Sequence, residues 1–195
     1  MMSVVAALAG VCTWSFLEYF IHRFAGHDRR LLKFKANFFG KEHTRHHSEG
    51  NYFASPQIKL LGAMVVVPII TCLVSLVAGI AIAAPYAVGF VGFYLYYEWL
   101  HMRLHTHSAK TRYGRWARKN HFFHHFHNPE SNHGVTSSIW DQVFGTHVVV
   151  DVVRVPEKLQ MDWLSDPETG DVWPEFAARG WQLRKLKKKK GKRAA

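Results

Sequence analysis

A continuous apolar stretch over residues 60–100 constrains this chain more than any other feature. These 41 residues include no Lys, Arg, Asp, Asn or Gln, and the only charged side chain is Glu98. A membrane-spanning helix needs about 20 apolar residues, so the stretch is long enough for two. Glycine and proline near its middle favour a break. We therefore expect two spanning helices near residues 58–80 and 85–100, joined by a tight turn.

Residues 2–21 form a third apolar segment, interrupted by Glu18 and a few small polar residues. A secretory signal peptide carries a positively charged region at its start, and no Lys or Arg precedes Arg23. We therefore predict that this segment is a retained membrane helix.

The distribution of basic residues predicts the orientation of the spans. Eight Lys and Arg residues lie between the first apolar segment and the apolar stretch that starts at residue 60, and the turn between the second and third spans has none. They are Arg23, Arg29, Arg30, Lys33, Lys35, Lys41, Arg45 and Lys59. Cytosolic loops carry such an excess, so we expect an external N-terminus and a cytosolic C-terminus, in a bacterial inner membrane or the endoplasmic reticulum.

The formal charge of +11 comes mostly from the C-terminal tail. Eight of the 25 Lys and Arg residues lie between Arg184 and Arg193, which leaves 17 cations against 14 acidic residues elsewhere. No nucleic-acid recognition motif accompanies the tail, so we expect no nucleic-acid partner. Cys12 and Cys72 lie singly in apolar runs, which excludes sites built from clustered thiolates.

Ten of the 14 histidines fall into four short clusters that this topology delivers to one face of the membrane. The second and fourth clusters have i, i+3, i+4 spacing and the third i, i+4, so each shares one helical face. The first pair is five residues apart, about 140° around an α-helix, so we expect the helix to end near Gly26 and the second histidine to fold back. The clusters are His22 and His27; His43, His46 and His47; His101 and His105; and His121, His124 and His125.

Imidazole is a ligand of iron, copper, zinc and nickel rather than of magnesium or calcium. Two transition-metal ions with about five ligands each would use ten imidazoles and leave room for oxygen or substrate. We therefore predict a two-metal site at these ten residues. His107, His127, His133 and His147 fall outside the repeated spacings, so we expect them at the surface or behind the ligands.

Three carboxylates lie near the clusters: Glu18, Glu98 and Asp141. Glu18 and Glu98 could be carboxylates that reach the membrane interface, or acceptors that orient the N–H group of a ligand histidine. We favour the second role because an acid in an apolar span is more often functional.

The motifs HRFAGH, HTRHH, HMRLH and HFFHH, with NHGVTSSIWDQVFGT at residues 132–146, resemble the fatty acid hydroxylase/sterol desaturase superfamily, and most closely the fatty acid hydroxylases. The resemblance runs from about Glu18 to Thr146. It implies an all-α integral-membrane bundle of three to four membrane helices, with a cytosolic helical cap that holds two iron ions on the ten histidines. Zinc could occupy the site in purified protein.

The resemblance also implies a reaction, in which O₂ is the co-substrate and an unactivated C–H bond of a membrane lipid's acyl chain is hydroxylated. We find no cytochrome b5-like segment and no G-x-G-x-x-G fingerprint, so electrons are expected from a separate cytochrome b5-like protein, ferredoxin or reductase. A desaturase and a sterol or carotenoid hydroxylase remain alternatives within the superfamily. A transition-metal transporter or a protein that keeps zinc as a structural ion is the alternative from another class.

We divide the chain into a membrane-embedded hydroxylase domain (1–147), a polar cytosolic extension (148–183) and a basic tail (184–195). The alternating VVVDVVRV at residues 148–155 predicts a short strand. For the tail, a solvated disordered segment is slightly favoured over attraction to anionic headgroups. The oligomeric state is not predicted.

Overall fold

The computed structural model describes residues 1–28, 30, 33 and 37–184. Most are helical, in the order α1 (Met2–Phe20), the π-helix η1 (Ile21–His27), α3 (Phe38–Ser48), α4 (Pro56–Ala78), α5 (Ile80–Thr106), α6 (Arg112–Phe126) and α7 (Ile139–Val143). A smaller C-terminal part holds β1 (Val153–Pro156), the 3-10 turn η2 (Glu157–Leu159), α8 (Pro174–Ala177) and β2 (Trp181–Arg184). The basic tail expected from Arg184 onward lies outside the described residues, except for Arg184 itself.

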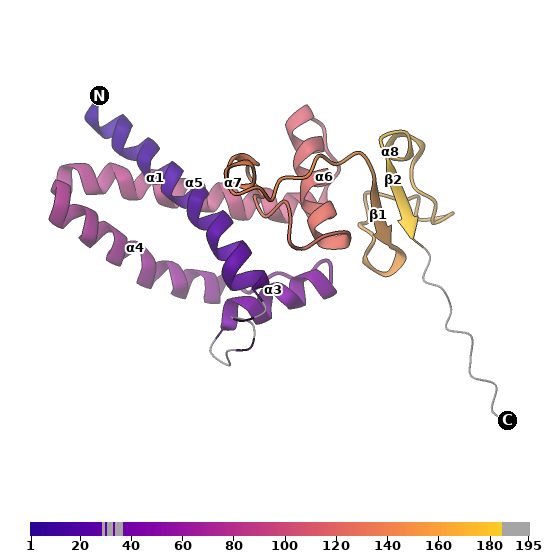
Figure 1. Cartoon of the computed structure of the whole chain (residues 1–195), viewed down its shortest axis with the longest axis horizontal. Coiled ribbons are helices and arrows are strands. Elements are labelled where there is room, and N and C mark those ends of the chain that lie inside the picture. Colours follow the sequence, from indigo (N-terminus) through magenta and orange to yellow (C-terminus); the bar gives the residue numbers. More distant parts are fainter. Residues whose placement is uncertain (29, 31–32, 34–36, 185–195) are drawn as a thin grey trace.

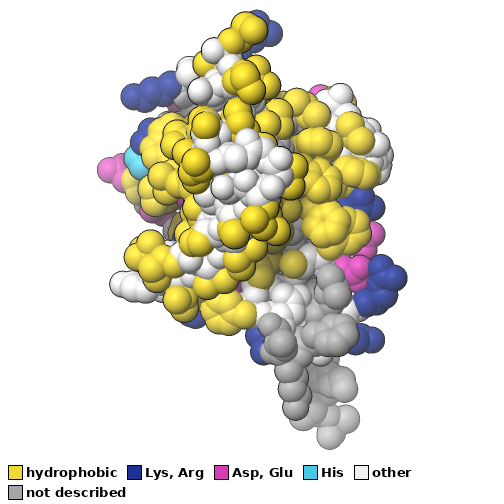
Figure 2. Space-filling view, turned by 90° about the vertical axis from the view of Figure 1, so that its left-hand side faces the viewer, with side chains coloured by type: hydrophobic (Ala, Val, Ile, Leu, Met, Phe, Trp, Pro, Cys, Tyr) yellow, Lys and Arg dark blue, Asp and Glu magenta, His cyan; other side chains and the backbone are white. Residues whose placement is uncertain are grey.

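Three helices are long and apolar enough to cross a membrane: Met2–His27, Pro56–Ala78 and Ile80–Thr106. They gather at one end of the molecule, with the shorter elements at the other (Figure 1). None of the residues of α4 is buried, and its exposed face is almost wholly apolar. Viewed onto that end, the surface is dominated by hydrophobic side chains (Figure 2). An exposed apolar surface of this size requires lipid around it, which confirms the expected membrane helical bundle.

The turn between α4 and α5 is a single residue, Gly79, with φ of +79°. A residue without Cβ adopts this left-handed conformation without steric cost, so one position reverses the chain. The expectation that the turn extends to Pro85 is wrong, because Pro85 lies in the second turn of α5. Proline there removes one backbone hydrogen bond, which membrane helices tolerate.

Close backbone contact joins α1 to α5. A Cβ atom on Gly89 would lie 1.9 Å from the Ala7 carbonyl oxygen, and one on Gly10 would lie 2.1 Å from that of Tyr86. Small residues at such crossings let membrane helices pack backbone against backbone. Toward the histidine end, Trp14 of α1 packs against aromatic rings of α5.

Helix α6 lies across the end of α5, and Arg118 fastens the two together. Its guanidinium donates to the carbonyl oxygens of Arg103 at 2.8 Å, Gly114 at 3.0 Å and His107 at 2.7 Å. The side chain of Thr111 caps the helix by accepting from the Gly114 N–H at 3.0 Å. These contacts fix the helix that carries the fourth histidine cluster.

The C-terminal unit, residues 151–184, packs onto the opposite side of α6 (Figure 1). Strands β1 and β2 pair in parallel, with Val153 opposite Trp181. Phe122 of α6 is wholly buried in the same core as Val153 and Trp181. The strand expected within residues 148–155 is confirmed only at its end, where β1 begins at Val153, whereas β2 was not predicted.

Candidate metal centre

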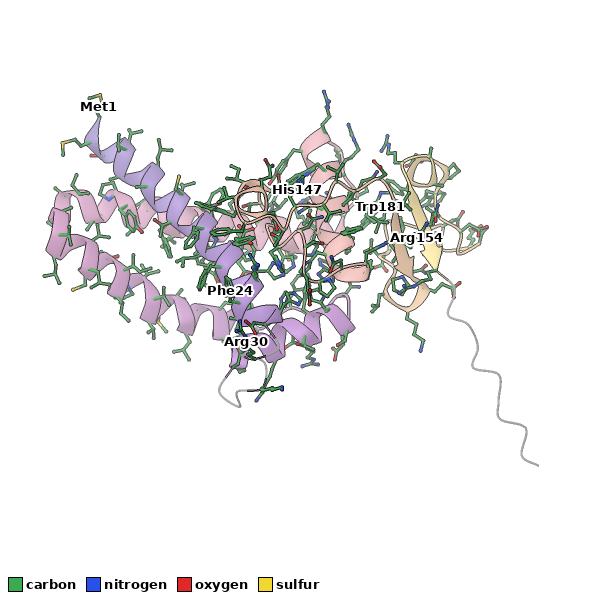
Figure 3. The ribbon with its side chains drawn as sticks, in the orientation of Figure 1. Met1, Phe24, Arg30, His147, Arg154 and Trp181 are labelled. Carbon is green, nitrogen blue, oxygen red and sulfur yellow. The ribbon has the colours of Figure 1, made fainter. Side chains whose placement is uncertain are left out.

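The ten clustered histidines lie in two groups of five on η1, α3, α5 and α6. Side chains fill the space where these elements meet, beside the labelled Phe24 of η1 (Figure 3). Within each group, one ring nitrogen per residue lies within 4.8 Å of the others. Group one is His22, His27, His43, His47 and His124, and group two is His46, His101, His105, His121 and His125.

In group one the Nε2 atoms point toward one another. The His124 Nε2 atom lies 2.9 Å from the Nε2 atoms of His22 and His27. The His43 Nε2 atom lies 2.8 Å from the His27 Nε2 atom and 3.0 Å from the His47 Nε2 atom. Five Nε2 atoms therefore face a common point, which suits a single small cation.

Group two repeats this arrangement. The Nε2 atoms of His101 and His46 are 3.0 Å apart, and those of His105 and His121 are 2.8 Å apart. His125 completes the group, and both its ring nitrogens are buried without a hydrogen-bond partner among the described residues. Its ring stacks on that of His47 at 4.0 Å between centroids, so the two groups are direct neighbours.

Helices α3 and α6 each contribute to both groups. From α3, His43 and His47 enter group one while His46 enters group two. From α6, His124 enters group one, and the remaining two histidines of its cluster, four residues apart, enter group two. The i, i+3, i+4 spacing thus serves two neighbouring sites, with the i, i+4 pair on one and the remaining residue on the other.

His22 and His27 share a face, contrary to the expectation from their separation of five. The α1 helix does not end at Gly26 but continues as the π-helix η1 through His27. A π-helix closes its hydrogen bonds from i to i+5, so residues five apart lie one above the other. The predicted fold-back is therefore wrong, and a wider helical turn brings the two rings together.

Backbone carbonyls orient three of the rings. The Nδ1–H groups of His22, His124 and His46 donate to the carbonyl oxygens of His133 at 2.5 Å, Ser131 at 2.7 Å and Tyr52 at 2.6 Å. A proton held on Nδ1 leaves the Nε2 lone pair free for a metal.

Two buried carboxylates hold the loop that supplies the first two of these carbonyls. Asp141 accepts from the N–H groups of His133 and Gly134, both at 2.8 Å, and Glu18 accepts from those of Val135 at 2.6 Å and Thr136 at 2.9 Å. Glu18 was expected to accept from a ligand histidine directly. Instead it accepts from the N–H groups of the loop, and also from the Thr136 hydroxyl at 2.8 Å.

Glu98 has a different environment from the other two acids. It forms an ion pair with Lys59, and it also hydrogen-bonds Tyr94. The expected contact with a ligand N–H is therefore absent from its described contacts, and this carboxylate links α5 to the start of α4.

His133 is the residue that spacing alone did not single out. It is 1% exposed, and its ring centroid lies 5.2 Å from that of His124 and 5.5 Å from that of His22. Only its position in the NHG stretch pointed to the site. His107, His127 and His147 lie outside both groups.

Burial keeps the rings outside the spans neutral. Desolvation, with the neighbouring imidazoles as a second cause, lowers the pKa of His43, His121, His124 and His125 well below the ordinary value. Desolvation by burial also lowers the pKa of His46, to about 4. Metal binding requires neutral imidazole, so the rings are in the form that a cation needs. Ten imidazoles in two convergent sets, with ring nitrogens of His121 and His125 that have no partner among the described residues, fit two transition-metal ions.

Comparison with known proteins gives a consistent set of similarities. The family model described as "Fatty acid hydroxylase" matches residues 7–146. The chain is 33% identical over 141 residues to the dihydroceramide fatty acyl 2-hydroxylase FAH2 of Arabidopsis thaliana, covering 70% of this chain and 58% of that protein. It is 31% identical to the ceramide very long chain fatty acid hydroxylase SCS7 of Saccharomyces cerevisiae, covering 73% and 38%.

A solved structure of full-length scs7p, in which only the hydroxylase domain is visible, superposes with a TM-score of 0.60 at 28% identity. The match covers 77% of this chain and 59% of the other. The chain therefore spans about 40–60% of the length of these relatives.

Proposed function

Since this chain belongs to the fatty acid hydroxylase family, we propose that it hydroxylates an unactivated C–H bond in the acyl chain of a membrane lipid. The reaction consumes one O₂, two electrons and two protons, and it yields a hydroxyl group on the acyl chain and one water. The observation that supports this most directly is the pair of five-histidine groups at the end of three membrane-capable helices.

We further propose that the ten histidines bind two iron ions. Iron would supply the redox chemistry that activates O₂, which no protein side chain performs. The protein contributes the imidazoles, and the carbonyls of His133, Tyr52 and Ser131 hold three of them, those of His22, His46 and His124, in one tautomer. Zinc occupation of purified protein is compatible with the same donors.

The surroundings of the site restrict access of water. The ring of Phe53 lies 5.2 Å from that of His46, 5.6 Å from that of His101 and 5.5 Å from that of His105. Beside group one, Tyr19 is 1% exposed and packs edge-on against His133. Rings in these places limit water near a reactive centre, and an acyl chain can approach from the bilayer along the helices.

For orientation, we propose that the histidine groups and the C-terminal unit are cytosolic and the N-terminus is external. The basic residues between the first two spans support this, because cytosolic loops concentrate Lys and Arg. The electrons would then come from a cytosolic donor.

For the substrate, we propose a very long acyl chain, either amide-linked in a lipid or present as the free fatty acid. The hydroxyl group would be added to the carbon next to the carbonyl of that chain. The support is that the relatives are named fatty acyl 2-hydroxylases and ceramide hydroxylases. Substrates of this kind enter laterally from the bilayer.

The test is expression in cells that lack 2-hydroxylated lipids, grown under ¹⁸O₂, followed by lipid mass spectrometry and metal analysis. We expect two metal ions per chain and one ¹⁸O atom in a hydroxylated acyl chain. His46→Ala and His124→Ala should lose metal and product, whereas His107→Ala, at an exposed ring outside both groups, should keep both. Two iron ions and supplied electrons without any oxidised lipid would contradict the proposal, and metal flux into proteoliposomes would favour a transporter.

A further inference from the structure

A groove of about 320 Å³ lies between α6 and the C-terminal unit. Since α6 lies between this unit and the membrane helices, the C-terminal unit that forms one wall of the groove lies on the far side of α6 from the spans (Figure 1). Tryptophan and basic side chains dominate its lining: Arg115, Lys119, Arg179, Trp116, Trp163 and Trp181.

The groove is strongly cationic. None of its lining residues is acidic, and residues 99–129 contain six Lys or Arg but no Asp or Glu. The ion pairs among the described residues involve none of its cations. Among these cations, Arg179 is exposed and Arg115 is half-buried. Positive charge here is uncompensated, which attracts an acidic partner.

Acidic residues of the C-terminal unit gather elsewhere. Six of them lie within residues 157–175, and a second cavity is lined by Glu157 and Asp171. The unit is thus positive at the groove and negative in the 157–175 segment. An acidic protein would be repelled from one region and attracted to the other, which selects a single orientation.

Aromatic contacts connect the groove to group two. The indole N–H of Trp163 donates to the carbonyl oxygen of His105 at 3.0 Å, and the Trp163 and Trp181 rings are 5.3 Å apart. Phe122 lies 4.9 Å from the His105 ring and 5.9 Å from the Trp181 ring. A protein bound in the groove would therefore be separated from a group-two ligand only by contiguous packed rings.

We propose that this groove is the docking site of an acidic, soluble one-electron carrier protein that supplies the hydroxylase reaction, an inference that rests on the proposed function. Two carrier molecules are oxidised by one electron each per turnover. These electrons, with two protons from solvent and O₂, give the hydroxylated chain and water. Electron-transfer encounters bury little surface and depend on charge, as a small cationic groove requires.

The experiment measures oxidation of reduced cytochrome b5 haem domain, an acidic carrier, by the iron-loaded full chain in nanodiscs made of neutral lipid. The groove variant combines Arg115→Glu with Arg179→Glu. The control variant combines Arg154→Glu with Lys158→Glu, which changes the net charge by the same amount at exposed positions outside the groove lining. We expect the groove variant to lower the second-order rate at low salt by about tenfold or more, and to weaken its salt dependence. The control variant should change the rate less than threefold.

Equal rates for the groove variant and wild type would overturn the docking proposal, as would an equal loss in both variants. A defect that appears only in nanodiscs with anionic lipid would also overturn it, and would assign the groove to headgroups. Dithionite replaces the carrier in a parallel single turnover, where both variants should form product at the wild-type level. If wild type forms no product with dithionite, the hydroxylase function itself fails, which is a distinguishable result.

Discussion

Replacing Asp141 by Asn should weaken metal binding by group one while leaving metal binding by group two unchanged. The Asp141 carboxylate is wholly buried and accepts three hydrogen bonds, from the N–H groups of His133 and Gly134 and from the Thr146 hydroxyl. The amide keeps the shape of the carboxylate but has only one acceptor oxygen. Whichever way it is placed, its NH₂ group meets a backbone N–H.

The size of the effect follows from these contacts. A buried N–H left without an acceptor costs about 1–3 kcal/mol, and the bonds that remain lose the strength that the charge provides. The loop can recover this energy by moving, and the carbonyls of Ser131 and His133 then no longer orient His124 and His22. Loss of such orienting partners lowers metal affinity about 10–100-fold, or about 1.4–2.7 kcal/mol.

The assay is a chelator titration of iron-loaded protein, with metal bound per chain measured by mass spectrometry. We expect wild type to release two ions at similar chelator concentration and Asp141→Asn to release one of them 10–100-fold more readily. The matched control is Glu98→Gln, since Glu98 contacts Lys59 and Tyr94 rather than the loop, and its titration should match wild type. Equal weakening of both ions, or unchanged release in Asp141→Asn, would refute the role assigned to the loop.

Three further outcomes follow from the packing and the electrostatics. Gly89→Ala should destabilise the α1–α5 contact by about 1–3 kcal/mol, measured by thermal unfolding in detergent, whereas Gly92→Ala, whose Cβ meets nothing within 4 Å, should not. Phe122→Ala should cost about 3–5 kcal/mol in urea unfolding and expose the C-terminal unit to protease first; protection equal to wild type would contradict its core position. Burial lowers the pKa of His46 to about 4 and of His133 to about 3 from the ordinary 6.5, so unfolding of the metal-free protein takes up protons below about pH 6.5. Its melting temperature should therefore fall as pH drops from 7 to 5, and a flat profile would contradict neutral burial.

The sequence predicts the membrane helices and the meeting of the ten histidines because both depend on strong, local patterns. An apolar run of 41 residues has few alternatives to a membrane hairpin, and i, i+3, i+4 spacing fixes side-chain direction on a helix. That the ten act as ligands stays a prediction.

Other features depend on tertiary contacts, which the local pattern does not record. The π-turn at His22–His27 changes the hydrogen-bond register without a sequence signal beyond Gly26. The role of Glu18 requires knowing that residues 135 and 136 lie beside it, more than 100 positions away. Strand β2 has four residues and exists through its pairing with β1.

The sharing of α3 and α6 between the two histidine groups has a consequence for biosynthesis. Each group includes residues of α6, the last of the helices that carry clustered histidines, so group one is complete only once His124 has been synthesised and group two only once His125 has been. By then the segments of all three spans have been synthesised. Neither five-histidine group can therefore form before all three spans have been synthesised, and a chain truncated before α6 contains only part of each group.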